Sequence, residues 1–109
     1  MFDPFEFEAI DWDDEEDEVG NLRHCLQHGV DESVMDEVLR EYPVEVTLRL
    51  KSAEFALVGP DRSGILWTLL FDRSWKRGDW LRPVTGWRSK PAEAKAWQAA
   101  TGRKLRGKQ

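Results

Sequence analysis

The chain has 109 residues, the length of one small domain, and 40% of them are hydrophobic, which is enough for a core. Its one cysteine, Cys25, excludes an internal disulfide, and no apolar run approaches the roughly 20 residues of a membrane-spanning helix. The acidic first residues differ from the basic and then apolar start of a secretory signal. We therefore expect a cytoplasmic protein that does not enter a membrane.

The net charge of −5 conceals an uneven distribution. Residues 1–20 hold ten acidic and no basic residues, whereas residues 73–109 hold 11 basic and two acidic ones. A basic segment rich in aromatic residues is typical of a nucleic-acid-binding surface. The acidic segment is either a solvated arm or a shield that covers the basic half until a polyanion displaces it. We treat residues 1–12 as an acidic arm, in which Phe5 and Phe7 alternate with acids as in a short edge strand.

Two helices are predicted after the arm. Residues 13–27 have apolar residues at helical spacing and acids in the first turn, and Gly29 is placed to cap this helix in a left-handed conformation. Asp31 is placed as the N-cap of a second helix with its own apolar stripe. Pro43 ends the second helix, because the residue before a proline disfavours helical angles.

From Pro43 onward the hydrophobic period changes from 3.6 residues to 2, which predicts strands. Ser89 is the expected cap of a last helix with Pro91 near its start, and residues 102–109 form a basic tail. The sequence therefore predicts one α+β domain over residues 13–101, with two N-terminal helices, a four-stranded antiparallel sheet and a C-terminal helix. The expected strands are residues 44–51, 54–59, 65–71 and 80–87, of which the apolar 65–71 is central.

The last predicted strand carries several residues with chemical potential. Pro83 and Gly86 within it favour an edge position or a β-bulge. Without a bulge, strict alternation assigns Trp80, Arg82, Val84 and Arg88 to one face and Leu81, Thr85 and Trp87 to the other.

These residue types suit metal-free cleavage of RNA, which needs an acid/base group and cations on the phosphate. His28 is the acid/base candidate, with the alternative that it only caps the first helix. His24 and His28 have the spacing of two metal ligands, but only Cys25 and carboxylates lie nearby as further ligands of a zinc site, and no cofactor is expected. The candidates for phosphate contacts are Arg73, Arg82 and Arg88, and the candidates for stacking on bases are Trp75, Trp80 and Trp87. The alternative for Trp87 is a place in the core.

Four stretches resemble, in matching order, the BrnT-like toxins of type II toxin–antitoxin systems: "DWDDEED", "HCLQHGVDESVMDEVL", "ALVGPDRSGILWTLLF" and "RPVTGWRSKPAEAKAW". The similarity extends over residues 11–101, and His28, Gly29 and Val30 match the His–Gly–Val element of the family. The resemblance implies a RelE/ParE-like α+β fold and a ribonuclease that halts translation by cleaving RNA. It also implies a DNA-binding antitoxin as the partner.

The sequence departs from the pattern of this family at four basic positions. Glu16 and Gln27 stand where the family has lysines, and Ile65 and Trp87 stand where it has arginines. These losses favour an alternative to cleavage, a non-catalytic binding module with a degenerate toxin fold. In that alternative the acidic arm imitates a run of phosphates and contacts a basic partner.

The sequence thus predicts a metal-independent endoribonuclease that acts on RNA and is neutralised by a cognate antitoxin. The expected catalytic residues are His28, Arg82 and Arg88, and the expected RNA-binding residues are Arg73, Lys76, Trp87, Lys90 and Lys95.

Overall fold

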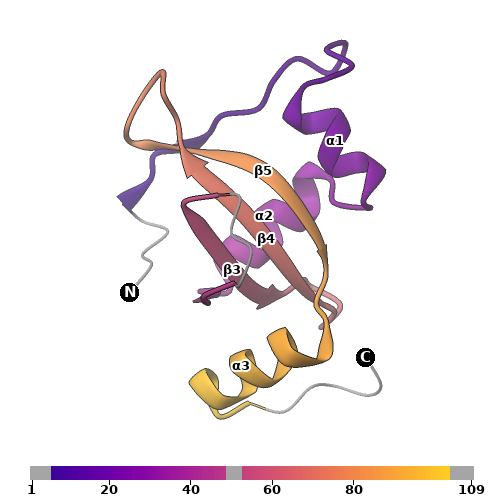
Figure 1. Cartoon of the computed structure of the whole chain (residues 1–109), viewed down its shortest axis with the longest axis vertical. Coiled ribbons are helices and arrows are strands. Elements are labelled where there is room, and N and C mark those ends of the chain that lie inside the picture. The colour runs from indigo at the N-terminus through magenta and orange to yellow at the C-terminus, as the bar shows by residue number, and fades with distance from the viewer. Residues whose placement is uncertain (1–5, 49–52, 104–109) are drawn as a thin grey trace.

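The computed structural model describes residues 6–48 and 53–103. In this part of the chain, a five-stranded mixed sheet and three helices form an α+β fold (Figure 1). The sheet order is β1-β5-β4-β3-β2, and β1 pairs in parallel with β5 while the other neighbours are antiparallel. In chain order the elements are β1 (Ala9–Ile10), α1 (Asn21–Gln27), α2 (Glu32–Arg40), β2 (Val44–Glu45), β3 (Phe55–Pro60), β4 (Leu66–Arg73), β5 (Trp80–Arg88) and α3 (Pro91–Thr101).

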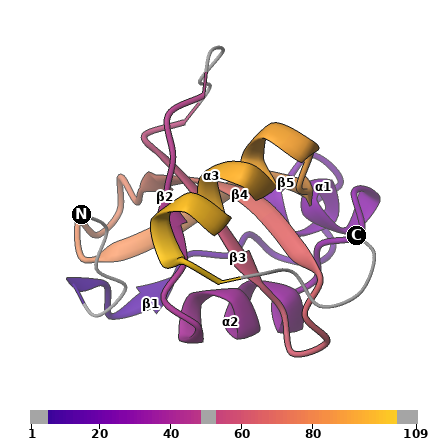
Figure 2. The same cartoon turned by 90° about the horizontal axis from the view of Figure 1, so that it is seen from below.

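The sheet separates two apolar layers, with α2 and α3 on opposite faces (Figure 2). On one face, Met35 and Val38 of α2 pack in a buried cluster with Phe71 of β4. On the other face, Trp97 of α3 packs with Leu66 of β4. Strand β4 is thus buried from both sides, which confirms its predicted central position.

Helix α2 follows its local sequence signals. The Asp31 side chain accepts a hydrogen bond from the Val34 N–H at 2.8 Å, as expected of an N-cap. Gly29 adopts φ 81°, the left-handed conformation that was predicted for the turn before α2. The helix ends at Arg40, before Pro43.

Helix α1 is shorter than predicted, because residues 13–20 form turns rather than helix. Asp14 Oδ1 accepts from the Glu16 N–H at 2.9 Å, and Asp17 Oδ1 accepts from the Val19 N–H at 3.1 Å. Such local bonds from aspartate side chains compete with helical hydrogen bonds. Val19 is 94% exposed and takes no part in the expected apolar stripe.

The sheet differs from the predicted four antiparallel strands in number and in direction. The N-terminal strand is Ala9–Ile10, which adds a parallel neighbour to β5. It also precedes the two helices. Of the expected strand Phe5–Phe7, Phe7 is not in a strand and Phe5 lies outside the described residues. The predicted strand over 44–51 is reduced to Val44–Glu45 among the described residues, and residues 49–51 lie outside them.

Strand β5 contains the predicted bulge. Leu70 pairs with Thr85 and Phe71 pairs with Pro83, so Val84 is the extra residue. The bulge shifts the alternation, and Val84 now lies with Trp87 on the face of α3. Strict alternation had assigned these two residues to opposite faces.

Helix α3 begins one residue later than expected, with Lys90 rather than Ser89 as its N-cap. Glu93 accounts for this position. Its Oε1 accepts from the Lys90 N–H at 2.9 Å and from Thr68 Oγ1 at 2.8 Å. Thr68 is fully buried in β4, so Glu93 anchors the start of α3 to the centre of the sheet.

Close packing at Gly86 gives a first testable prediction. A Cβ at this position would lie 2.7 Å from Leu69 Cδ2 and 3.2 Å from the Thr68 carbonyl oxygen. We expect Gly86→Ala to destabilise the fold by about 1–3 kcal/mol through overpacking, measured by urea unfolding. Gly78→Ala is the matched control, because nothing lies within 4 Å of the added carbon there. Equal stability of Gly86→Ala and the wild type would contradict the packing described.

Candidate active site beside helix α1 and strand β5

His28 lies at the exposed C-terminus of α1 on a well-supported backbone. Cys25, one turn earlier, is fully buried, and its carbonyl oxygen accepts a hydrogen bond from the Val30 N–H at 2.9 Å. Gly29 allows the chain to turn directly after the helix, and Val30 is buried. The His28 backbone is therefore fixed by buried neighbours, while the residue itself is exposed.

The turn after α1 packs over the C-terminal end of β5. A Cβ on Gly86 would lie 3.2 Å from Val30 Cγ2, and a Cβ on Gly29 would lie 3.8 Å from Trp67 Cη2. Trp67 pairs with Arg88 across the β4–β5 ladder, so these two side chains leave the sheet on the same face. Arg88 therefore lies on the face that carries the turn after His28.

Arg88 is exposed, and within residues 6–48 and 53–103 its side chain has no hydrogen-bond or ion-pair partner. His24 lies one turn before His28, with ring centroids 5.0 Å apart, and its Nε2 is 3.2 Å from Thr85 Oγ1. We call His24, His28, Thr85 and Arg88 the α1–β5 site. The site combines two imidazoles, a hydroxyl and a guanidinium, which together suit phosphoryl transfer.

Arg82, the other predicted catalytic arginine, lies at a different place and has carboxylate partners. Its Nη1 and Nη2 donate to Oδ1 and Oδ2 of Asp13 at 2.9 and 2.8 Å, and Nη1 lies 3.5 Å from Asp11 Oδ2. Six residues of strand, about 20 Å, separate Arg82 from Arg88. The two arginines therefore lie too far apart to act on one phosphate, and carboxylates hold the Arg82 guanidinium.

Arg73 and Lys76, both expected to bind RNA, also contact carboxylates. Lys76 Nζ lies 3.7 Å from Asp11 Oδ1, and Arg73 Nε lies 3.7 Å from Glu54 Oε2. The Arg73 guanidinium also lies 5.0 Å from the centre of the Phe7 ring. Because acids accompany these basic residues, the described part of this end of the sheet shows no surplus of positive charge toward RNA.

The turn between β4 and β5 presents an exposed aromatic ring beside the same balanced charges. Trp75 is 80% exposed, and Lys76 Nζ lies 5.4 Å from its ring centroid. Arg77 lies 5.3 Å from the Trp80 ring and forms ion pairs of 3.0 Å, one of them with Asp79. Stacking of Trp75 on a base would therefore lack the support of unpaired cations.

Trp87, Lys90 and Lys95 lie on the other side of the sheet from Arg88. Trp87 packs with the buried Leu70, and its Nε1 donates to Glu93 Oε1 at 2.9 Å. This agrees with the alternative prediction of a packing role for this tryptophan. Lys90 Nζ lies 5.5 Å from the Trp87 ring centroid, and both Lys90 and Lys95 are exposed.

Two acids that the sequence did not single out organise the opposite end of β5. Asp11 is only 3% exposed and accepts from Ser74 Oγ at 2.7 Å. Asp13 exchanges two hydrogen bonds with Asn21, and Asn21 Nδ2 donates to the Pro83 carbonyl oxygen at 2.9 Å. We call Asp11 and Asp13 the acidic brace. Nothing in the sequence distinguishes these two from the other eight acids of residues 1–20.

The acidic brace predicts a pH dependence of stability. The hydrogen bond from Arg82, together with the one from the Asn21 N–H, lowers the pKa of Asp13 from its ordinary value of 3.8. A carboxyl whose pKa is lower in the folded state stabilises the fold fully above the unfolded pKa and loses this contribution as the pH falls through the folded one. The free energy of unfolding of the wild type should therefore approach that of Asp13→Asn on acidification from about pH 6 to about pH 2. If the difference in free energy of unfolding between the wild type and Asp13→Asn stayed constant over this pH range, this role of Asp13 would be contradicted.

Other chemical roles find little support in the described residues. Burial raises the pKa of the Cys25 thiol to about 11, which keeps this group protonated and unreactive. No three His, Cys, Asp or Glu side chains of the described ranges gather as metal ligands. None of the described helices is long and apolar enough to cross a membrane.

Comparisons of the chain with protein-family models, with curated proteins and with solved structures found no match.

Proposed function

We propose that the chain is a metal-independent endoribonuclease of the toxin type and that the α1–β5 site is its catalytic centre. The observation that carries this proposal is the combination of an arginine without a carboxylate partner among the described residues, Arg88, with the exposed His28 at the same end of β5. Both were expected catalytic residues, although 60 residues separate them in the sequence.

Each residue has a defined task in this proposal. The imidazole ring can both donate and accept a proton, so His28 serves as an acid/base group. The guanidinium of Arg88 donates two parallel hydrogen bonds to the phosphate and stabilises the negative charge that develops on it. The match of His28, Gly29 and Val30 to the BrnT-like toxins supports the same assignment.

Basic residues near the end of β5 extend the proposed RNA surface. Lys90 and Lys95 are exposed on the α3 side of the sheet, so they would contact phosphates farther along the RNA than the one that Arg88 binds. Arg73, Lys76 and Arg82 are left out of this surface because carboxylates hold them. As for the BrnT-like toxins, a cognate antitoxin would neutralise the protein.

Induced expression in a bacterial host tests the proposal. Wild-type protein should arrest growth and deplete total RNA, and Arg88→Ala should relieve both effects. Arg40→Ala is the matched control, because Arg40 is an exposed arginine of α2 that pairs only with Asp36 of its own helix. Normal growth with intact RNA from a folded wild-type protein would contradict the proposal.

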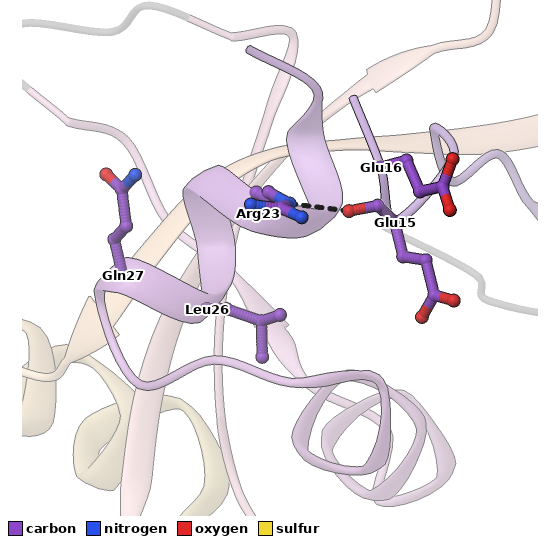
Figure 3. Close-up of a pocket in the computed structure, with 5 residues that line it drawn as sticks. All are labelled: Glu15, Glu16, Arg23, Leu26 and Gln27. Carbon is purple, nitrogen blue, oxygen red and sulfur yellow. Dashed lines mark hydrogen bonds between the residues drawn. The ribbon is translucent and has the colours of Figure 1, made fainter. Parts of the chain in front are cut away.

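A second candidate function, binding of a basic protein segment, is favoured by a separate observation. Residues 14–18 are five exposed acids, and none of them forms an ion pair with a described residue. Arg23 Nε donates to the Glu15 carbonyl oxygen and thereby fixes this acidic loop beside α1. Figure 3 shows the open hollow between them, which is lined by Glu15, Glu16, Arg23, Leu26 and Gln27.

Leu26 gives this hollow an apolar contact, since it is 49% exposed. A lysine- and arginine-rich peptide with one large apolar residue should therefore bind there at low salt. The double variant Glu15→Gln/Glu16→Gln should weaken binding in calorimetry. The variant Glu41→Gln/Glu45→Gln removes two exposed acids elsewhere and should not. If both double variants weakened peptide binding equally, the loss of net charge alone would explain the effect, and the hollow would not be the binding site.

A further inference from the structure

His24 belongs to the α1–β5 site, but neither the sequence prediction nor the proposed function gives it a catalytic role. Its ring lies edge to face with that of His28, with centroids 5.0 Å apart and an interplanar angle of 65°. Both residues are exposed, so solvent and substrate reach them. Spacing by four residues places the two side chains on one side of α1.

The orientation of His24 is set by a residue from the sheet. Its Nε2 lies 3.2 Å from Thr85 Oγ1, which is 61 residues away in the sequence. Thr85 follows the bulge at Val84, and Gly86 next to it allows the close packing of the turn after α1. The bulged part of β5 therefore places a hydroxyl where it can hold one ring nitrogen of His24 and leave the other free.

We propose that His24 and His28 act as the acid and the base of an in-line transphosphorylation of RNA, with Thr85 as the positioning residue of His24. This inference rests on the proposed ribonuclease function. In the protonated His24 both ring nitrogens carry a hydrogen, so in this proposal Nε2–H donates to Thr85 Oγ1 and Nδ1–H donates to the leaving oxygen. His28 is the base.

The proposed step needs no further reactant. His28 takes the proton of the ribose 2′-OH, and the 2′-oxygen forms a bond to phosphorus. The bond between phosphorus and the 5′-oxygen breaks, its electron pair goes to that oxygen, and the oxygen takes the proton of His24. Arg88 binds the non-bridging oxygens throughout. The products are a 2′,3′-cyclic phosphate and a 5′-hydroxyl, so the substrate must be RNA.

The purified full chain can be tested on a DNA oligonucleotide that contains a single ribonucleotide, with product ends identified by mass spectrometry. His24→Ala and His28→Ala should each slow cleavage on the order of 10²–10⁴-fold, the usual contribution of a positioned acid or base. A second substrate carries sulfur in place of the 5′-oxygen, a leaving group that needs no proton. On this substrate His24→Ala should regain near wild-type rates, whereas His28→Ala should remain slow.

Variants of other residues separate catalysis from a structural effect. Ser33→Ala changes an exposed residue of α2 outside the site and should keep the wild-type rate. Thr85→Val should slow cleavage of the normal linkage with less effect on the sulfur linkage. Thr85→Ser, which retains the hydroxyl, should restore the rate.

The outcomes distinguish this inference from the function on which it rests. A wild-type protein that leaves the ribonucleotide intact overturns the proposed function. Cleavage by the wild type with unchanged rates for His24→Ala and His28→Ala overturns only the inference. A 5′-phosphate on the product, or failure of the sulfur substrate to rescue His24→Ala, also overturns it.

Discussion

Replacing Arg82 with alanine should lower the free energy of unfolding by about 2–4 kcal/mol, because the change breaks a largely buried ion pair. The side chain of Arg82 is 25% exposed and that of Asp13 is 17% exposed. Without the guanidinium, Asp13 loses two hydrogen bonds, and the buried Asp11 loses one of its two nearby cations. Urea denaturation at neutral pH measures the effect directly.

Arg77→Ala is the matched control for this stability prediction. Arg77 also contacts two carboxylates, at 3.0 Å from Glu8 and Asp79, but its side chain is 53% exposed. Solvent-exposed pairs contribute little, so this variant should unfold close to the wild type. If Arg82→Ala were as stable as Arg77→Ala, the acidic brace would have no structural role and Arg82 would again be a candidate for RNA contact.

Replacing Arg88 with alanine should have the opposite pattern, a large loss of activity with unchanged stability. Removal of a hydrogen-bond donor that stabilises developing charge costs about 2.7–4 kcal/mol of activation free energy, which corresponds to a rate reduction on the order of 10²–10³-fold. Because the Arg88 side chain has no hydrogen-bond or ion-pair partner among the described residues, its removal breaks no polar contact there. Cleavage kinetics of the Arg88→Ala protein measure the loss of activity, and urea unfolding of the same preparation measures its stability.

Two further variants sharpen the Arg88 prediction. Arg88→Lys keeps the charge but not the paired donors, so it should recover only part of the activity. Arg40→Ala, which removes an exposed arginine of α2, should cleave at the wild-type rate. An Arg88→Ala protein with full activity would remove this arginine from the reaction.

Local signals predicted those parts of the fold that depend on few neighbours. Asp31 and Gly29 specify the start of α2 and the turn before it through their own side chain and backbone angle. The apolar run over 65–71 identified the central strand, and Pro83 with Gly86 identified the bulge. In each case the responsible residues lie within a few positions of the feature.

Features that depend on distant partners could not be predicted in the same way. The parallel pairing of Ala9–Ile10 with β5 joins segments about 70 residues apart, and so does the ion pair between Asp13 and Arg82. A count of charges along the chain showed an acidic and a basic half, but not which acid neutralises which base. The idea of a displaceable shield also fits poorly, because Asp11 is buried and Ile10 and Trp12 pack against the core.

The candidate site likewise combines residues that local sequence features predict with contacts that depend on distant partners. His28 and Arg88 were found from residue type and position, whereas His24 was set aside as a weak metal ligand. Its contact with Thr85 depends on the bulge at Val84 and on the packing of α1 against β5, neither of which a sequence pattern specifies. Arg82 and Arg88 stand close together in the sequence, yet only Arg88 is without a carboxylate partner among the described residues.

The most direct test of the central claim is the cleavage of an oligoribonucleotide by the purified wild-type chain in the presence of EDTA. The α1–β5 site predicts cleavage at a rate that the chelator does not change, and no cleavage of the DNA strand of the same sequence. An intact oligoribonucleotide, incubated with a protein whose folding is verified by urea denaturation, would contradict the claim and favour the binding of a basic partner at the acidic loop.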